Sequence, residues 1–173
     1  MKENIILVGF MGTGKTAIGE LLAKELKMEF IELDQAIEKK AGKSIPDIFA
    51  QDGEIRFREW EIQLCKETSE KKNIIVATGG GIVLNKINVD YFKRNGIVYC
   101  LESTPEVILE RTMKDGKEKR PLLNNPDPAS TIKNLLEFRA PFYKAAADHI
   151  INVNKDLDSI IKEIIKIHQK NKS

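Results

Sequence analysis

Apolar residues along this chain occur in two patterns, short runs rich in β-branched residues and longer segments with helical spacing. Short apolar runs bounded by polar or turn residues are typical of strands buried in a parallel sheet. Five such runs are expected to be strands: 5–8, 29–33, 74–77, 97–101 and 149–153. Segments with helical periodicity lie among them, such as 16–26, 55–68, 106–113 and 157–168. This alternation predicts an α/β fold in three layers, a five-stranded parallel sheet covered by helices on both faces.

One region contains more residues than a crossover connection between two strands requires. Between residues 34 and 60 two helical pieces are separated by a break at 41–46 and followed by a turn at Asp52 and Gly53. We expect this segment, about 34–61, to form a helical insert that binds the substrate.

A second region, 114–128, is polar, dense in charge and rich in turn residues. Such composition indicates a surface loop, and its functional interpretation is a lid over about 112–125. We expect both regions to belong to a single domain that covers residues 1–173, because that length and an apolar content of 42% suit one core.

Charge and targeting signals narrow the class of protein. The 28 basic and 26 acidic residues nearly cancel, which gives little reason to expect nucleic acid or a membrane as partner. The apolar run that ends at Gly9 is too short for a signal peptide or a membrane span. We therefore expect a cytoplasmic protein, and a monomer. Cys65 and Cys100 are far apart without a CxxC pattern, so neither zinc nor a disulfide framework is indicated.

The strongest chemical motif is GFMGTGKT at residues 9–16, which matches GxxxxGK[ST] directly after a predicted strand and before a predicted helix. Its glycines let backbone N–H groups surround phosphate oxygens, Lys15 reaches the outer phosphates, and Thr16 offers a hydroxyl to Mg²⁺. Glycine-rich turns between a strand and a helix also occur in α/β folds that bind no nucleotide. The complete pattern nevertheless predicts an ATP site, with nucleotide contacts from Gly12, Thr13, Gly14, Lys15 and Thr16.

Acidic residues follow the second predicted strand, whereas the third leads into Thr78 and three glycines without a carboxylate. Glu32 and Asp34 lie two positions apart, and in an extended chain this spacing places both side chains on one side. One carboxylate could then hold the metal while the other orients or deprotonates an acceptor hydroxyl. The alternative for Asp34 is a cap on a helix that begins near Gln35.

Gly79, Gly80 and Gly81 follow the third predicted strand, at the edge where sheets of this kind place ligands. Without Cβ atoms these residues allow a substrate to approach the backbone closely. A flexible turn with no ligand is the alternative.

Arginine is rare, with six residues against twenty-two lysines, so each arginine is a candidate fork for a carboxylate or phosphate. Arg58 has an alternative role in helix ion pairs with Glu54 and Glu61, and Arg120 in the lid has an alternative as a solvated charge. Arg139 lies among aromatic residues and proline, where an unpaired cation would be costly, which favours an anionic partner.

Together these residues resemble the shikimate kinase family, from residue 6 to about residue 153. The motifs that carry the resemblance fall in order along the chain: GFMGTGKT, ELD at 32–34, SIPDIFAQDGEIRFREWE at 44–61, ATGGG at 77–81, RPLL at 120–123 and RAPFY at 139–143. The resemblance implies ATP-dependent phosphorylation of shikimate to shikimate 3-phosphate, a step of aromatic amino-acid biosynthesis, with Mg²⁺ as cofactor.

The same resemblance implies roles for individual residues. Shikimate would be bound by Asp34, Arg58, Glu61, Gly79, Gly80, Gly81 and Arg139, with the arginines on its carboxylate. Catalysis would depend on Asp34, Lys15 and Arg120, and Arg111 would lie near the adenine. One departure is that the family usually has Asp-x-Asp where this chain has Glu32-Leu33-Asp34. The extra methylene moves the carboxylate by about 1.5 Å, so we expect Glu32 to hold Mg²⁺ through water.

Two other functions remain open from the residues alone. One is a different small-metabolite kinase, which would act on gluconate or a nucleoside monophosphate. The other is a regulator that binds ATP without transferring its phosphoryl group, which no metabolite would stimulate.

Overall fold

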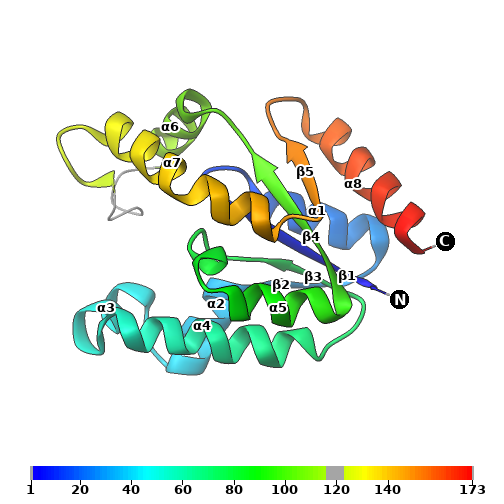
Figure 1. The fold of residues 1–173 in the computed structure, drawn as a ribbon, viewed down its shortest axis with the longest axis horizontal. Coiled ribbons are helices and arrows are strands. Elements are labelled where there is room, and N and C mark those ends of the chain that lie inside the picture. Colours follow the sequence, from blue (N-terminus) through cyan, green and yellow to red (C-terminus); the bar gives the residue numbers. More distant parts are fainter. Residues whose placement is uncertain (1, 116–122, 173) are drawn as a thin grey trace.

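The computed structural model describes residues 2–115 and 123–172. Within them, five parallel strands form one sheet in the order β2-β3-β1-β4-β5 (Figure 1). The strands are β1 (Asn4–Gly9), β2 (Glu29–Glu32), β3 (Ile74–Ala77), β4 (Gly96–Glu102) and β5 (His149–Asn152). The predicted parallel sheet is confirmed, although β2 and β5 each end one residue earlier than expected.

Helices cover both faces of the sheet because successive side chains of a buried strand point to opposite sides. Ile5 and Leu7 of β1 pack with α1 (Lys15–Leu26) and α8 (Leu157–Lys172). Ile6 and Val8 face the opposite layer. That layer includes α4 (Gly53–Ser69), α5 (Lys86–Asn95), α6 (Pro105–Lys114) and α7 (Pro128–Ala146). The three-layer α/β architecture is therefore confirmed.

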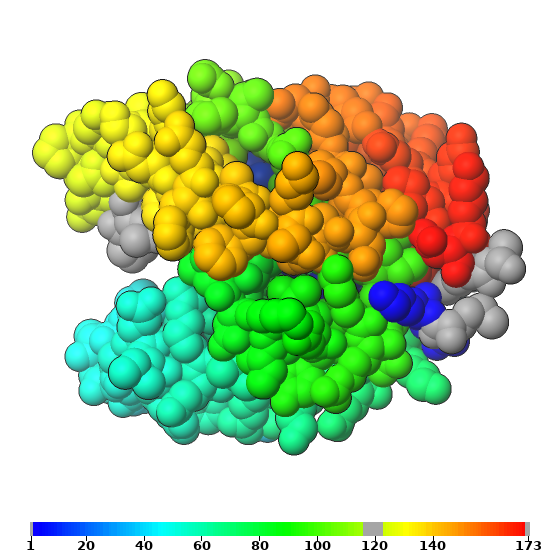
Figure 2. Space-filling model, viewed as in Figure 1, coloured from blue at the N-terminus to red at the C-terminus, as the bar shows by residue number. Residues whose placement is uncertain are grey.

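The predicted insert contains α2 (Leu33–Ala41) and α3 (Ile45–Gln51), and it continues into α4. Gly42 ends α2 with a left-handed φ of 72°, and Gly53 begins α4 with a φ of 86°. Both are turns that a residue without Cβ adopts at little cost. Figure 2 shows the surface hollowed between the cyan segment that holds α3 and the yellow start of α7.

The predicted lid is described only at its ends. Thr112 belongs to the last turns of α6, so this helix continues into the segment expected to be a lid. Leu123 is buried, and residues 116–122, which include Arg120, lie outside the described residues. Of the helices in the described ranges, none combines the length and apolar character needed to cross a membrane.

Three neighbouring strands end at the same level of the sheet, so the segments that follow them begin side by side. Leu7 of β1 is in register with Ala77 of β3, and Ala77 is in register with Glu32 of β2. The motif loop after β1, the start of α2 and the triple glycine after β3 therefore lie next to one another at the carboxyl edge, where open α/β sheets bind ligands.

Gly9 shows why the motif loop needs glycine at its first position. It pairs with Leu101 of β4, and a Cβ on Gly9 would lie 2.6 Å from the Leu101 carbonyl oxygen. Its backbone φ of 150° is also one that residues other than glycine rarely adopt. The chain can leave β1 in this direction only without a side chain.

The Gly9→Ala variant is expected to lose about 3 kcal/mol of unfolding free energy, since backbone strain and a clash with a fixed carbonyl add together. Gly42→Ala is the matched control, because its φ of 72° is unfavourable but nothing lies within 4 Å of its added Cβ. That control should lose only about 1 kcal/mol. Urea denaturation measures both, and equal losses would show that the contact with Leu101 is unimportant.

Candidate active site

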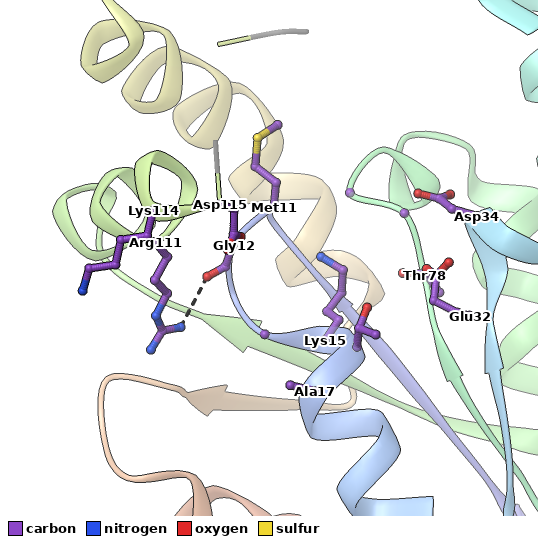
Figure 3. Close-up of a pocket in the computed structure, with 14 residues that line it drawn as sticks. Met11, Gly12, Lys15, Ala17, Glu32, Asp34, Thr78, Arg111, Lys114 and Asp115 are labelled. Carbon is purple, nitrogen blue, oxygen red and sulfur yellow. Dashed lines mark hydrogen bonds between the residues drawn. The ribbon is translucent and has the colours of Figure 1, made fainter. Parts of the chain in front are cut away.

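A cleft of about 550 Å³ lies at the carboxyl edge of the sheet (Figure 3). Arg111 and Lys114 of α6 lie on one side, Glu32 and Asp34 lie on the other, and Lys15 lies between them. The cleft is lined by Met11, Gly12, Gly14, Lys15, Thr16, Ala17, Glu32, Asp34, Thr78, Gly79, Gly80, Arg111, Lys114 and Asp115. The structure thus brings both predicted carboxylates to the predicted nucleotide motif.

The motif loop has the backbone expected of an anion cradle. Gly12 and Gly14 have left-handed φ angles of 75° and 89°, and α1 begins at Lys15, so the positive end of the helix dipole faces the cleft. The Lys15 ammonium donates to the carbonyls of Gly9 and Phe10 at 2.7 and 2.9 Å. Thr13 is buried, and its hydroxyl donates to the Phe10 carbonyl at 2.7 Å, so its side chain supports the loop from behind.

The predicted geometry of Glu32 and Asp34 is wrong, although both residues line the cleft. The prediction assumed an extended chain, but α2 begins directly after β2 and Asp34 lies in its first turn. Asp34 is not the cap either: Glu32 accepts a hydrogen bond from the Gln35 N–H at 2.8 Å and is itself the N-cap. Glu32 therefore fixes the start of the helix that carries Asp34.

Burial raises the pKa of both carboxyl groups above their ordinary values. For Asp34 the positive charge of Lys15 opposes this effect, while Glu38 adds to it. For Glu32 the hydrogen bond from Gln35 opposes it, while the charge of Asp34 adds to it. A carboxylate held partly away from water binds protons and cations more readily than an exposed one.

Each residue of the triple glycine lies against one charged side chain. A Cβ on Gly79 would be 2.9 Å from Oδ1 of Asp34, and one on Gly81 would be 2.9 Å from Nη1 of Arg58. A Cβ on Gly80 would be 3.3 Å from Nη1 of Arg139. Glycine at these positions permits this close approach, and the loop gathers one carboxylate and two guanidinium groups.

Arg58 makes the predicted ion pairs and also reaches the triple glycine. It donates to Glu61 at 2.7 Å and contacts Glu54 at 3.4 Å. The Glu61 side chain is only 3% exposed, and burial raises the pKa of its carboxyl group although Arg58 opposes that rise. The structural and the functional interpretations of Arg58 are thus compatible, because Glu61 holds the guanidinium at the loop.

Arg139 is 8% exposed and lies with its guanidinium carbon 5.7 Å from the centre of the Phe10 ring. Its Nε is buried without a hydrogen-bond partner. Among the described residues, no carboxylate forms an ion pair with Arg139. The apolar environment inferred from the sequence is present, and the charge of Glu61 acts on this cation without forming an ion pair with it.

Arg111 connects the motif loop with the residue that follows β5. It donates from α6 to the Gly12 carbonyl at 3.3 Å (Figure 3). It also donates to the Val153 carbonyl at 3.3 Å. This position beside the motif loop suits a contact with a bound base, and the role remains a prediction.

Several lining residues were not identified from the sequence. Thr78 donates to the Leu7 carbonyl at 2.9 Å and so joins the end of β3 to β1. Met11, Lys114 and Asp115 also line the cleft. Met11 and Thr78 lie within the GFMGTGKT and ATGGG motifs, and Lys114 and Asp115 lie within the predicted lid, but none of the four was given a role from the sequence.

The Arg58→Met variant should leave the Glu61 carboxylate buried without its partner, at a cost of about 2 kcal/mol near neutral pH. The pKa of Glu61 is already raised by burial and should rise further without Arg58. When a group has a higher pKa in the folded protein than in the unfolded chain, the folded protein loses stability as pH rises above the unfolded pKa. The loss of unfolding free energy relative to wild type should therefore grow as pH rises from 4.5, the ordinary pKa of a glutamate, towards neutrality.

Urea denaturation at several pH values measures this deficit. The double variant Arg58→Met with Glu61→Gln is the control, since it has no carboxyl group to titrate at this position and should show little pH dependence. A deficit in the single variant that does not change with pH would contradict the role given to Glu61.

Comparisons with known proteins place these observations in a family. A family model described as shikimate kinase matches residues 11–169. The shikimate kinase of Pelotomaculum thermopropionicum is 45% identical over 163 residues, which covers 94% of each chain. That of Caldanaerobacter subterraneus subsp. tengcongensis is 43% identical and covers 97% of each chain. A solved structure of shikimate kinase from Acinetobacter baumannii in complex with shikimate has a TM-score of 0.91 and 37% identity, covering 98% of this chain and 94% of that one.

Proposed function

This chain belongs to the shikimate kinase family, and we propose that its cleft transfers the terminal phosphoryl group of ATP to a hydroxyl of shikimate. The observation that carries this proposal is the triple glycine, where Asp34, Arg139 and Arg58 approach three successive residues. Two guanidinium groups suit a carboxylate, and a neighbouring carboxylate suits a hydroxyl. Shikimate carries both groups on one small ring.

ATP binding is supported by the motif loop. The backbone N–H groups around Gly12 and Gly14, with the N-terminus of α1, provide donors for phosphate oxygens. Lys15 would exchange its contacts with two loop carbonyls for the outer phosphates. Arg111 would lie near the adenine.

Magnesium is proposed as cofactor, held by Thr16 and Glu32. Both line the cleft, and a hydroxyl and a carboxylate are oxygen donors of the kind that Mg²⁺ prefers. No group of three or more His, Cys, Asp or Glu residues suited to a metal occurs in the described ranges, so water and phosphate oxygens would complete the coordination. When bound, the ion would offset charge on the phosphates. Because Glu32 also caps α2, contact through water would leave that cap intact.

Asp34 is proposed to direct the acceptor hydroxyl towards the phosphoryl group and to receive its proton. A pKa raised by burial makes its carboxylate a better proton acceptor than an exposed one. Lys15 and, from outside the described residues, Arg120 would offset charge on the transferring group. Closure of the proposed lid would exclude water and so limit hydrolysis of ATP.

Other parts of the proposal concern the whole protein. We propose a single kinase domain over 1–173 in which about 34–61 form the substrate-binding insert. We also propose that the enzyme acts as a monomer. The use of ATP suits a cytoplasmic enzyme.

An ADP-release assay with Mg-ATP tests the proposal, with shikimate, gluconate and AMP compared as acceptors. Shikimate alone should stimulate turnover strongly, since it alone among them combines a carboxylate for the arginines with a hydroxyl for Asp34 on one small ring. Stimulation by gluconate or AMP instead would show that the acceptor is that compound and not shikimate. Slow hydrolysis that no acceptor stimulates would favour a nucleotide-dependent regulator.

The Asp34→Asn variant separates catalysis from folding in the same assay. Turnover should fall about 100-fold or more, the usual range for general acid–base catalysis, while ATP affinity is retained. Asp90→Asn is the control, because Asp90 is an exposed residue paired with Lys86 away from the cleft. Equal losses of turnover and ATP binding in Asp34→Asn would instead make Asp34 a structural residue.

A further inference from the structure

Tyr143 lies on α7 one turn after Arg139, and both side chains are buried. Residues four positions apart on a helix share one face, so α7 presents this phenol and this guanidinium side by side. Nothing in the sequence motifs gave Tyr143 a role beyond its place in RAPFY.

The Tyr143 hydroxyl donates to the Gly80 carbonyl at 2.6 Å. A Cβ on Gly80 would lie 3.7 Å from this hydroxyl, 3.3 Å from Nη1 of Arg139 and 3.7 Å from the Met11 backbone nitrogen. Helix α7, the triple glycine and the motif loop therefore meet at Gly80. The phenol provides the hydrogen bond that joins the first two.

The direction of this hydrogen bond is fixed by chemistry. A carbonyl oxygen can only accept, so the hydroxyl must donate to Gly80, and its lone pairs are left to face the positive charge of Arg139. Burial raises the pKa of Tyr143 to about 12, against the opposing charge and hydrogen bond of Arg139. The phenol thus keeps its proton, and remains a donor, throughout the neutral range.

Pro141 weakens the helix beside this anchor. It lies inside α7 between Arg139 and Tyr143, and it has no N–H for the carbonyl one turn before it. The helix is therefore weakened at the point where Arg139 must be held. A tertiary hydrogen bond just beyond the proline fixes the helix against the triple glycine.

We propose that Tyr143 is a positioning residue for the acceptor: its hydroxyl fixes Gly80 and Arg139 relative to each other, so that the guanidinium faces the substrate carboxylate. This inference rests on the proposed function of the same cleft. It also implies that losing the hydroxyl affects the acceptor more than ATP, whose proposed contacts are made by other residues of the motif loop.

Tyr143→Phe tests the proposal, because it removes only the hydroxyl and keeps the buried ring. The KM for shikimate should rise about tenfold or more, as expected when a buried carbonyl loses its donor, while the KM for ATP stays within about twofold. Tyr99→Phe is the matched control: Tyr99 is fully buried on β4, and its hydroxyl lies 3.5 Å from His168 on the opposite face of the sheet. That variant should change neither KM.

The outcomes are distinct. A wild-type enzyme that shikimate does not stimulate would remove the proposed function itself. If the wild type is active, two results would overturn only the role of Tyr143. One is an unchanged KM for shikimate in Tyr143→Phe, and the other is an equal rise of the KM for shikimate and the KM for ATP. If Tyr143→Phe does not fold in buffer, the comparison is repeated for all variants with an osmolyte such as sucrose, which favours the folded state and leaves Pro141 in place. Failure to fold there as well would make Tyr143 a residue of the fold and contradict the proposal.

Discussion

Charge that is held away from water needs an opposite charge, and the cleft of this protein supplies that balance unevenly. Glu61 is matched by Arg58, and Lys15 partly offsets the charge on Asp34. Arg139 is nearly as buried as Glu61, yet no carboxylate in the described part of the chain pairs with it. This imbalance is the physical basis of the anion sites that we propose, for phosphates at the motif loop and for a carboxylate at the triple glycine.

The order of the strands creates this arrangement. Because β3 lies between β2 and β1, the triple glycine that follows β3 has α2 with Asp34 on one side and the motif loop on the other. Glycines at 79–81 then let Asp34, Arg139 and Arg58 lie close to the backbone, where an added Cβ would displace these side chains. A small acceptor can therefore meet all three side chains while it lies next to the proposed phosphate site.

The sequence predicted the parts of this cleft that depend on local pattern. The β-branched runs indicated the sheet, the motif at 9–16 indicated the phosphate loop, and the aromatic environment of Arg139 indicated a buried cation. The sequence-based prediction of the geometry at Asp34 was wrong. Helix α2 starts directly after β2, and its N-cap is a glutamate, which is not a residue that favours this position. Tyr143 was also missed, since its contact with Gly80 joins segments that no local pattern connects.

The central claim is that the acceptor is selected by its carboxylate at Arg139. Calorimetric titration of the enzyme with shikimate and with its neutral carboxamide, repeated for Arg139→Met, measures that selection directly. Wild type should bind the acid about 100-fold more tightly than the amide, and the variant should lose most of this preference while its ATP affinity is kept. An equal preference for the acid in both proteins would contradict the account.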